Sequence, residues 1–136
     1  MEIVKTSVDE VVGQFLDSEF DAYAEKCGMT CGYEDFCFVA REDGKILGVI
    51  TGHSYYHEVH IADLVVSPEA RGRGIGASLV RSVEAEFTDE RWENINLTTY
   101  GFQAPEFYKK LGYEVEYIRE SSDERLRKFF MIKRLR

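Results

Sequence analysis

The sequence contains no long apolar run and little proline. Its apolar stretches fall well short of the roughly 18 residues that a membrane-spanning helix needs, so no membrane partner is expected. The first residues, MEIVKTSVDE, lack the basic and apolar regions of a secretory signal, which favours a cytoplasmic protein. With 2 prolines and 44% hydrophobic residues among 136, the composition is that of an ordinary globular protein. The length predicts one domain, residues 1–136.

Cysteine is also scarce. The 3 cysteines, Cys27, Cys31 and Cys37, are an odd number within one short stretch. No histidines follow them at the spacing of a zinc finger, so no metal site is expected. Reduced thiols with a structural role in a reducing compartment are the expected state.

Positive charge is scarce in the first half of the chain. The net charge of −8 argues against general nucleic-acid binding, which needs a basic face. Residues 1–70 hold 14 Asp and Glu against 4 Lys and Arg, whereas residues 119–136 hold 3 against 7. The acidic part favours a cationic partner or forms a solvated surface. The basic tail, residues 125–136, is the one feature that suits a nucleic-acid-binding module, and its alternation is more typical of a terminal strand.

Hydrophobic periodicity predicts three helices. Ser7 and Glu10 fit a capping box that begins a helix over residues 8–27. A second helix, over residues 75–87, has an apolar stripe at every fourth position, formed by Ile75, Leu79, Val83 and Phe87. A third covers residues 105–111, with proline in its first turn and glycine after its end.

Alternating and apolar runs predict the strands. They cover residues 36–41, 46–56, 59–66, 94–99, 113–119 and 128–133, and the turn EDGK joins the first two. The expected order is β-α-β-β-β-α-β-α-β-β, in which tight turns join the early strands and helices separate the later ones. This order indicates a mixed α/β domain of the α+β class.

The stretch ARGRGIGASLV contains glycines at three alternate positions, Gly72, Gly74 and Gly76, between a predicted strand and a predicted helix. The first amides of a helix have no intrahelical acceptor, and the helix dipole places partial positive charge there. Because glycine has no Cβ, an anion can approach these amides closely. The pattern therefore predicts an anion-binding loop.

Three other interpretations fit this loop less well. A P-loop ends in Gly-Lys-Ser/Thr, whereas here Gly76 is followed by Ala77 and Ser78. A dinucleotide-binding fold places its glycines after the first strand of a βαβ unit, whereas these lie in mid-chain after several strands. The third is a tight strand-to-helix turn with no ligand.

Two stretches resemble the GNAT superfamily of N-acetyltransferases. LVVSPEARGRGIGASLV is similar to its cofactor motif, a hydrophobic strand followed by Arg/Gln-x-x-Gly-x-Gly/Ala and a helix, and FQAPEFYKKLGYEVE (102–116) resembles its later motif. With the order of elements, the resemblance covers nearly the whole chain from Phe36 on. It implies a central, mostly antiparallel sheet with splayed central strands and flanking helices, and acetyl-CoA as the acetyl donor.

The resemblance also implies the residues that bind acetyl-CoA. The cofactor would lie where strands 59–66 and 94–99 splay apart, with its pantetheine arm paired to the backbone of Leu64, Val65 and Val66. The loop residues Arg71, Gly72, Arg73, Gly74, Ile75, Gly76 and Ala77 would hold the pyrophosphate. Ala104 and Phe107 would flank the rest of the cofactor. Many members have asparagine at the position of Gly101, and here either Gln103 or the backbone alone is expected to take its place.

Acetyl transfer to an amine needs a base for the amine and an acid for the departing thiolate. Tyr108 matches the position at which the superfamily often has its general acid. His60 is the expected base, because its ordinary pKa lies near neutral pH. His57, Glu58 and Asp63 are rivals, and Asp63 faces the opposite side of the strand from His60 unless a bulge intervenes. Two alternatives stay open: a structural role for His60, and a water relay from several weak bases.

The resemblance implies direct transfer to a primary amine of a small molecule or peptide in a ternary complex. The least patterned regions, the first helix, residues 28–35 and residues 52–57, are expected to choose the acceptor. The acidic bias favours a cationic amine. A non-catalytic acyl-CoA-binding regulatory domain is the alternative, and similarity suggests a homodimer through the C-terminal strands.

Overall fold

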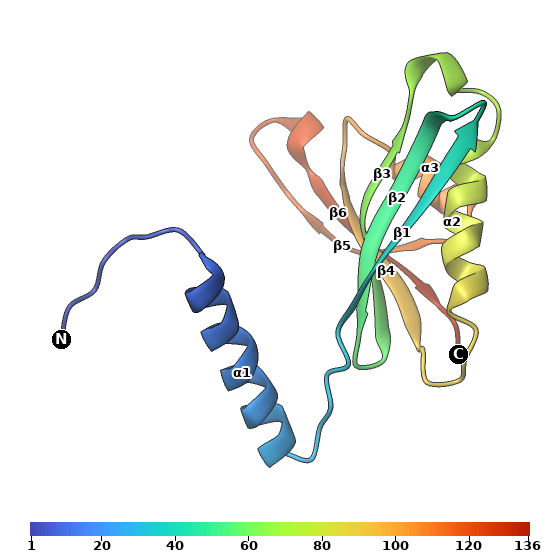
Figure 1. Ribbon diagram of the computed structural model, residues 1–136. Helices are drawn as coiled ribbons and strands as arrows, with labels where there is room; N and C mark the ends of the chain where they lie inside the picture. The colour runs from blue at the N-terminus through green and yellow to red at the C-terminus, as the bar shows by residue number, and fades with distance from the viewer. The chain divides into compact units, whose positions relative to one another are not determined.

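The computed structural model describes all residues, 1–136, which form two compact units, Met1–Gly32 and Tyr33–Arg136 (Figure 1). The first unit contains one helix, α1 (Glu10–Lys26), preceded by residues 1–9 without helix or strand. Asp9 caps this helix, since its carboxylate accepts from the amide of Val12 at 2.9 Å. The expected capping box at Ser7 is therefore wrong by two residues. The strand expected before this helix is absent as well.

The second unit is built on a six-stranded sheet in the order β1-β2-β3-β4-β6-β5. The strands are β1 (Glu34–Glu42), β2 (Lys45–Tyr55), β3 (Glu58–Val66), β4 (Asn94–Tyr100), β5 (Glu114–Arg119) and β6 (Lys128–Arg134). The helices are α2 (Ile75–Glu86) and α3 (Pro105–Lys110), with 3₁₀ turns η1 (Pro68–Ala70) and η2 (Glu124–Leu126). Each predicted helix and strand of this unit is present within two residues of its expected ends. None of the helices in the chain has both the length and the hydropathy to cross a membrane.

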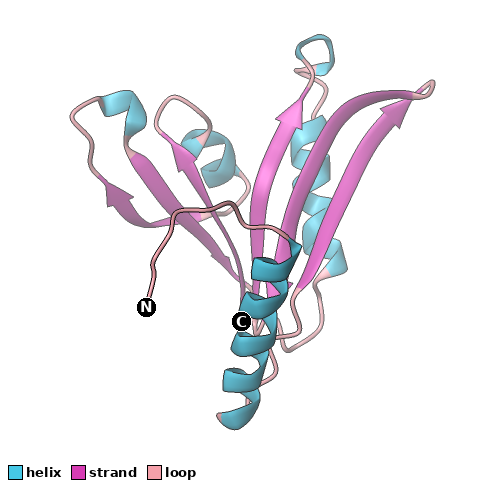
Figure 2. Ribbon diagram, turned by 60° about the vertical axis from the view of Figure 1, so that its left-hand side comes forward, coloured by secondary structure: helices cyan, strands magenta, loops and turns pink.

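The middle of the sheet is interrupted. All neighbouring strands are antiparallel except β3 and β4, which pair in parallel over only three positions, Glu58–His60 against Asn94–Asn96. Beyond that junction the two strands separate, and Figure 2 shows the two groups of strands diverging. The expected splayed central strands are confirmed.

The core lies on one face of this sheet, beneath α2 and α3. Ile50, Val59, Ile95 and Met131 of the strands are fully buried together with Val80 and Val83 of α2, and Tyr108 of α3 joins the same cluster. Each such Ile or Val contributes about 1.5–3 kcal/mol of burial free energy. Because both helices are anchored there, the loops that lead into them from the far ends of β3 and β4 are held in place.

The opposite face of the sheet is polar near the junction. It carries Thr51 and His53 of β2 opposite Asp63 and His60 of β3, and the register shifts between these two pairs. β3 therefore holds one extra residue, Ala62, opposite β2. This bulge puts Asp63 on the same face as His60. It is the interruption of strict alternation under which the two side chains were expected to share a face.

Candidate active site

The glycine loop turns sharply into α2. Gly72 and Gly74 have φ of 81° and 76°, in the left-handed region that favours glycine. Gly74 is the N-cap of α2, and no side chain accepts from the first amides of the helix. These amides, with the positive end of the helix dipole, form a cradle for an anion. The residues present therefore fit a pyrophosphate.

The two arginines of the loop have different surroundings. Arg71 donates from Nε to the carbonyl oxygen of Val66 at 3.3 Å, next to the end of β3. Arg73 forms an ion pair with Glu42, in which Nη2 and Oε2 lie 2.6 Å apart. The hydrogen bond from Arg73 lowers the pKa of Glu42. Arg73 is thus tied to the first hairpin, and Arg71 is the arginine without a carboxylate partner.

A narrow slot of about 340 Å³ lies between the separated parts of β3 and β4. Its walls include Leu64 and Val65 of β3, Thr98 and Thr99 of β4, and Tyr108 of α3. The β3–β4 ladder has ended before these residues, so the edges of both strands lack a strand partner there. Such edges bind an extended chain by main-chain hydrogen bonds.

The turn from β4 into α3 closes the end of the slot. Gln103 and Ala104 line it. The Gln103 side chain accepts from the amide of Tyr100 at 3.0 Å, which leaves its NH₂ group for a ligand. Thr99 accepts from the amide of Ala104 at 3.3 Å and so helps to begin the helix, a role that the sequence did not indicate. Phe107 reaches the glycine loop, because a Cβ on Gly76 would lie 3.3 Å from its ring.

The surroundings of position 101 explain why this chain has glycine where many GNAT members have asparagine. A Cβ there would lie 2.9 Å from the carbonyl oxygen of Glu124 in η2. The amides of Gly101 and Phe102 donate to the carbonyls of Arg127 and Arg125 at 2.8 and 3.0 Å. The turn that lines the slot is therefore braced by the η2 segment, too closely for any side chain at this position.

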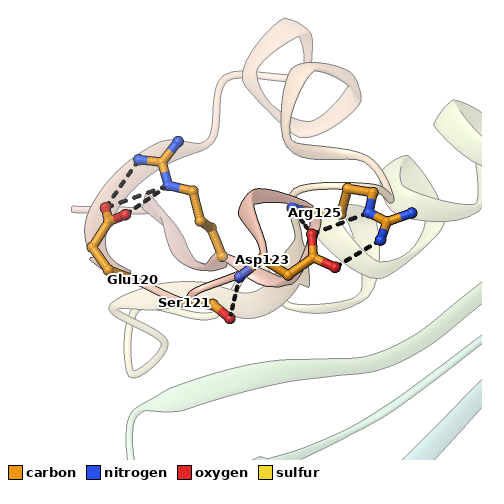
Figure 3. Close-up of polar contacts among 5 residues, drawn as sticks. Glu120, Ser121, Asp123 and Arg125 are labelled. Atoms are coloured by element: carbon orange, nitrogen blue, oxygen red, sulfur yellow. Dashed lines mark hydrogen bonds and ion pairs between the residues drawn. The ribbon is translucent and has the colours of Figure 1, made fainter.

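The η2 segment is itself held by local ion pairs (Figure 3). Asp123 and Arg125 pair at 2.7 Å, and Arg127 pairs with Glu120 at 3.1 Å. The hydroxyl of Ser121 accepts from the amide of Asp123 at 3.3 Å. The hydrogen bonds from Arg125 lower the pKa of Asp123. These contacts fix the backbone that supports the turn after β4.

Tyr108 lies at the inner wall of the slot. Its side chain is 6% exposed and contacts the rings of Phe107 and Tyr113. Burial raises the pKa of Tyr108 to about 12, because desolvation disfavours the phenolate. The phenol therefore keeps its proton at neutral pH and can donate a hydrogen bond, while its raised pKa makes it a weaker acid than an exposed tyrosine.

His60 is held by a chain of amide contacts at the junction. Its Nδ1 lies 2.7 Å from Oδ1 of Asn96, and the NH₂ group of Asn96 donates to Glu58 at 3.0 Å and to Asn94 at 2.8 Å. Because the NH₂ group is directed at two acceptors, Oδ1 faces the imidazole and accepts from Nδ1–H. Nε2 is then the ring nitrogen with a free lone pair. Sequence reasoning named His60 and missed Asn96, which lies 36 residues further along the chain.

The rival bases lie in different places. Glu58 is bonded to Asn96, as above, and Asp63 accepts from the Thr51 hydroxyl at 2.8 Å and lines the slot. His57 pairs with Glu93 at 3.2 Å in the turn that precedes the junction. His60 alone among the four has its proton position fixed by a neutral amide.

Rings from the expected acceptor region gather beside His60. The ring of His53 lies 5.2 Å from that of His60, 5.4 Å from that of Tyr55 and 5.1 Å from that of Tyr33. Burial lowers the pKa of His53, and His60 lowers it further. The structure therefore brings residues 52–57 to the side of the junction that carries His60.

The glycine loop, the interrupted sheet and the slot agree with the resemblance to GNAT proteins. The family model described as the acetyltransferase (GNAT) family matches residues 3–113, and the chain belongs to this family. Blasticidin-S acetyltransferase of Streptomyces morookaense is 33% identical over 79 residues, which are 57% of this chain and 58% of that protein. The chain spans little more than half the length of such relatives.

Solved structures show the same fold. An acetyltransferase from Bacillus cereus is 28% identical and superposes with a TM-score of 0.80 over 98% of both chains. An aminoglycoside 6'-N-acetyltransferase in complex with coenzyme A is 20% identical, with a TM-score of 0.66 over 75% of this chain and 73% of that one. The expected GNAT fold is confirmed.

Proposed function

We propose that this chain is an acetyl-CoA-dependent N-acetyltransferase. It transfers the acetyl group directly to a primary amine of a small molecule or peptide while both ligands are bound. The observation that carries the proposal is the early end of the β3–β4 ladder. It leaves a slot between two strand edges, with Tyr108 among its walls.

In this proposal, different segments bind different parts of acetyl-CoA. The amides of the loop 71–77 bind the pyrophosphate, and Arg71 adds a full charge. The backbone of Leu64 to Val66 pairs with the pantetheine arm as an added strand would. The NH₂ group of Gln103, Ala104 and the ring of Phe107 bound the arm on its other side. Arg73 contributes through its backbone, since its side chain is paired with Glu42.

Acetyl-CoA, when bound, supplies a thioester whose carbonyl carbon is open to attack by an amine. His60 accepts at Nε2 the proton that the amine loses as its nitrogen bonds to that carbon. Tyr108 donates its phenolic proton to the sulfur as the carbon–sulfur bond breaks. The products are an N-acetylated amine and the free thiol of coenzyme A, and solvent then takes the extra proton from His60 and returns one to Tyr108.

The acceptor is a small amine on two grounds. Blasticidin-S acetyltransferase acts on blasticidin-S, as its name says, which supports a small-molecule acceptor for this chain. The acidic residues of the first half favour a cationic one. Both grounds concern the class of acceptor and leave the individual compound to an acceptor screen.

Two measurements test this function. Acetyl-CoA at 100 times its Kd raises the free energy of unfolding by about 2.7 kcal/mol, which a thermal melt detects. Release of coenzyme A with a panel of amines then measures turnover. A melt that acetyl-CoA does not move contradicts the cofactor slot. A stabilised protein that acetylates none of the amines favours the regulatory acyl-CoA-binding domain instead.

A further inference from the structure

A second pocket opens on the polar face of the sheet, at the junction of β3 and β4. It has a volume of about 530 Å³, within the range of about 300–1,000 Å³ that small-molecule sites occupy. Its walls include Tyr55, Glu58, His60, Asn96 and Phe130. We refer to it as the junction pocket. Its size suits a small molecule or a single side chain rather than a folded partner.

The junction pocket adjoins the cofactor slot. Leu97 and Thr98 of β4 line both of them, at the point where β4 has just parted from β3. The slot lies between the strands, whereas the pocket opens on the face that carries His60. A molecule in the junction pocket therefore lies next to the slot, whose walls include Tyr108.

The two carboxylates that line the junction pocket differ in their partners. Its two carboxylates are those of Glu58 and Glu116. Glu116 lies 3.7 Å from the guanidinium of Arg134, and its charge is partly balanced. Glu58 accepts only from the neutral amide of Asn96, at 3.0 Å through one oxygen. Glu58 is thus the carboxylate of the pocket that has no cation beside it.

Cations already lie at one aromatic wall of the pocket. The ring of Phe130 has the guanidinium of Arg119 at 5.2 Å and the ammonium of Lys128 at 5.4 Å, so it acts as an apolar wall. A ligand cation is therefore favoured at the β3 side of the pocket, near Glu58, and disfavoured near Phe130.

We propose that the junction pocket binds the acceptor, and that the acceptor is a small amine with a second cationic group. Glu58 binds the cationic group while His60 accepts the proton of the amine that is acetylated. The two residues are neighbours on one face of β3, so their Cα atoms lie about 6–7 Å apart. A short aliphatic diamine spans that separation. This proposal rests on the proposed acetyl transfer.

The test compares three acceptors of equal chain length at the same pH. Putrescine carries a second cation, butylamine carries none, and γ-aminobutyrate carries an anion. We expect kcat/KM to fall in that order, by about tenfold between putrescine and butylamine. Glu58→Gln keeps the acceptor for Asn96 and removes the charge, so the preference should collapse to less than about threefold. Glu114→Gln, a lost charge on β5 outside the pocket, should retain it.

Binding gives a readout that does not depend on turnover. In the protein saturated with coenzyme A, calorimetric titration of putrescine should yield a Kd that Glu58→Gln raises about tenfold and Glu114→Gln leaves unchanged. Equal kcat/KM for the three acceptors overturns the acceptor class while acetyl transfer stands. Equal losses of putrescine affinity in Glu58→Gln and Glu114→Gln overturn the role of Glu58. Absence of any turnover overturns the proposed function together with this inference.

Discussion

The imidazole Nδ1 of His60 and the amide Oδ1 of Asn96 lie 2.7 Å apart across the three-position junction of β3 and β4. The amide is oriented by its own donation to Glu58 and Asn94, and it leaves Nε2 as the ring nitrogen with a free lone pair. In the proposed acetyl transfer, Asn96 is therefore a positioning residue for His60.

Asn96→Leu should lower kcat about tenfold and leave the KM for acetyl-CoA unchanged. The imidazole then loses its orientation, and its protonated form loses an acceptor. The loss should therefore fall on kcat and not on the KM for acetyl-CoA, a split that a general structural defect would not cause. Stopped assays with butylamine at varied acetyl-CoA concentration measure this split. A normal kcat would rule out the positioning role.

Gly74→Val should abolish the stabilisation of the protein by acetyl-CoA. Gly74 has φ of 76°, and a Cβ added there would have nothing within 4 Å. The cost therefore comes from the backbone conformation, about 1–3 kcal/mol, and from the loss of the amide cradle. Gly44→Val is the matched control, because Gly44 has φ of 75° and equally open surroundings in the first hairpin. It should lower the melting temperature similarly and keep the full response to acetyl-CoA.

Tyr108→Phe should slow acetyl transfer and preserve acetyl-CoA binding, since only the phenolic proton is lost. Transfer at the wild-type rate would disprove the acid role. Acetyl-CoA melts run on the same variant verify that the slot is intact.

The same substitution should change stability at high pH. Burial raises the pKa of Tyr108 to about 12 from about 10 in the unfolded chain. The neutral phenol therefore contributes stability that is complete below about pH 10 and is lost as the pH rises towards 12. Urea unfolding should show that the free energy of unfolding falls less between about pH 9 and about pH 11 in Tyr108→Phe than in the wild type. Part of the fall should persist in the variant, because burial also raises the pKa of Tyr113.

Gly101→Ala should destabilise the protein by about 1–3 kcal/mol and raise the KM for acetyl-CoA. Its Cβ would lie 2.9 Å from the carbonyl oxygen of Glu124, so the turn after β4 or the η2 segment must move. Gly13→Ala, at a helical position with nothing within 4 Å, is the control and should not lower the melting temperature. Equal melting temperatures for both variants would show that the contact between the turn after β4 and the η2 segment is dispensable.

The sequence predicted the features that depend on local pattern. The glycine loop, the apolar stripe of α2 and the positions of the strands follow from short-range spacing, and the structure has all of them. Features that depend on distant partners were missed. Asn96 acquires its role only through β3, and the extra residue Ala62 is defined by pairing with β2.

The N-terminal errors have a similar origin. Ser7 and Asp9 are both good caps, and a capping box alone cannot choose between two candidates so close together. The strand expected ahead of α1 is absent because a strand exists only through pairing, and residues 1–9 join no ladder.

The interrupted ladder between β3 and β4 also affects solubility. Free strand edges are the places at which separate protein molecules join into aggregates, and here two of them lie in the middle of a sheet. The gap is narrow, with Tyr108 and Gln103 among its walls, and it admits a single slender chain rather than the flat border of another sheet. The protein thus offers unpaired main-chain groups to a small ligand while shielding them from its own copies.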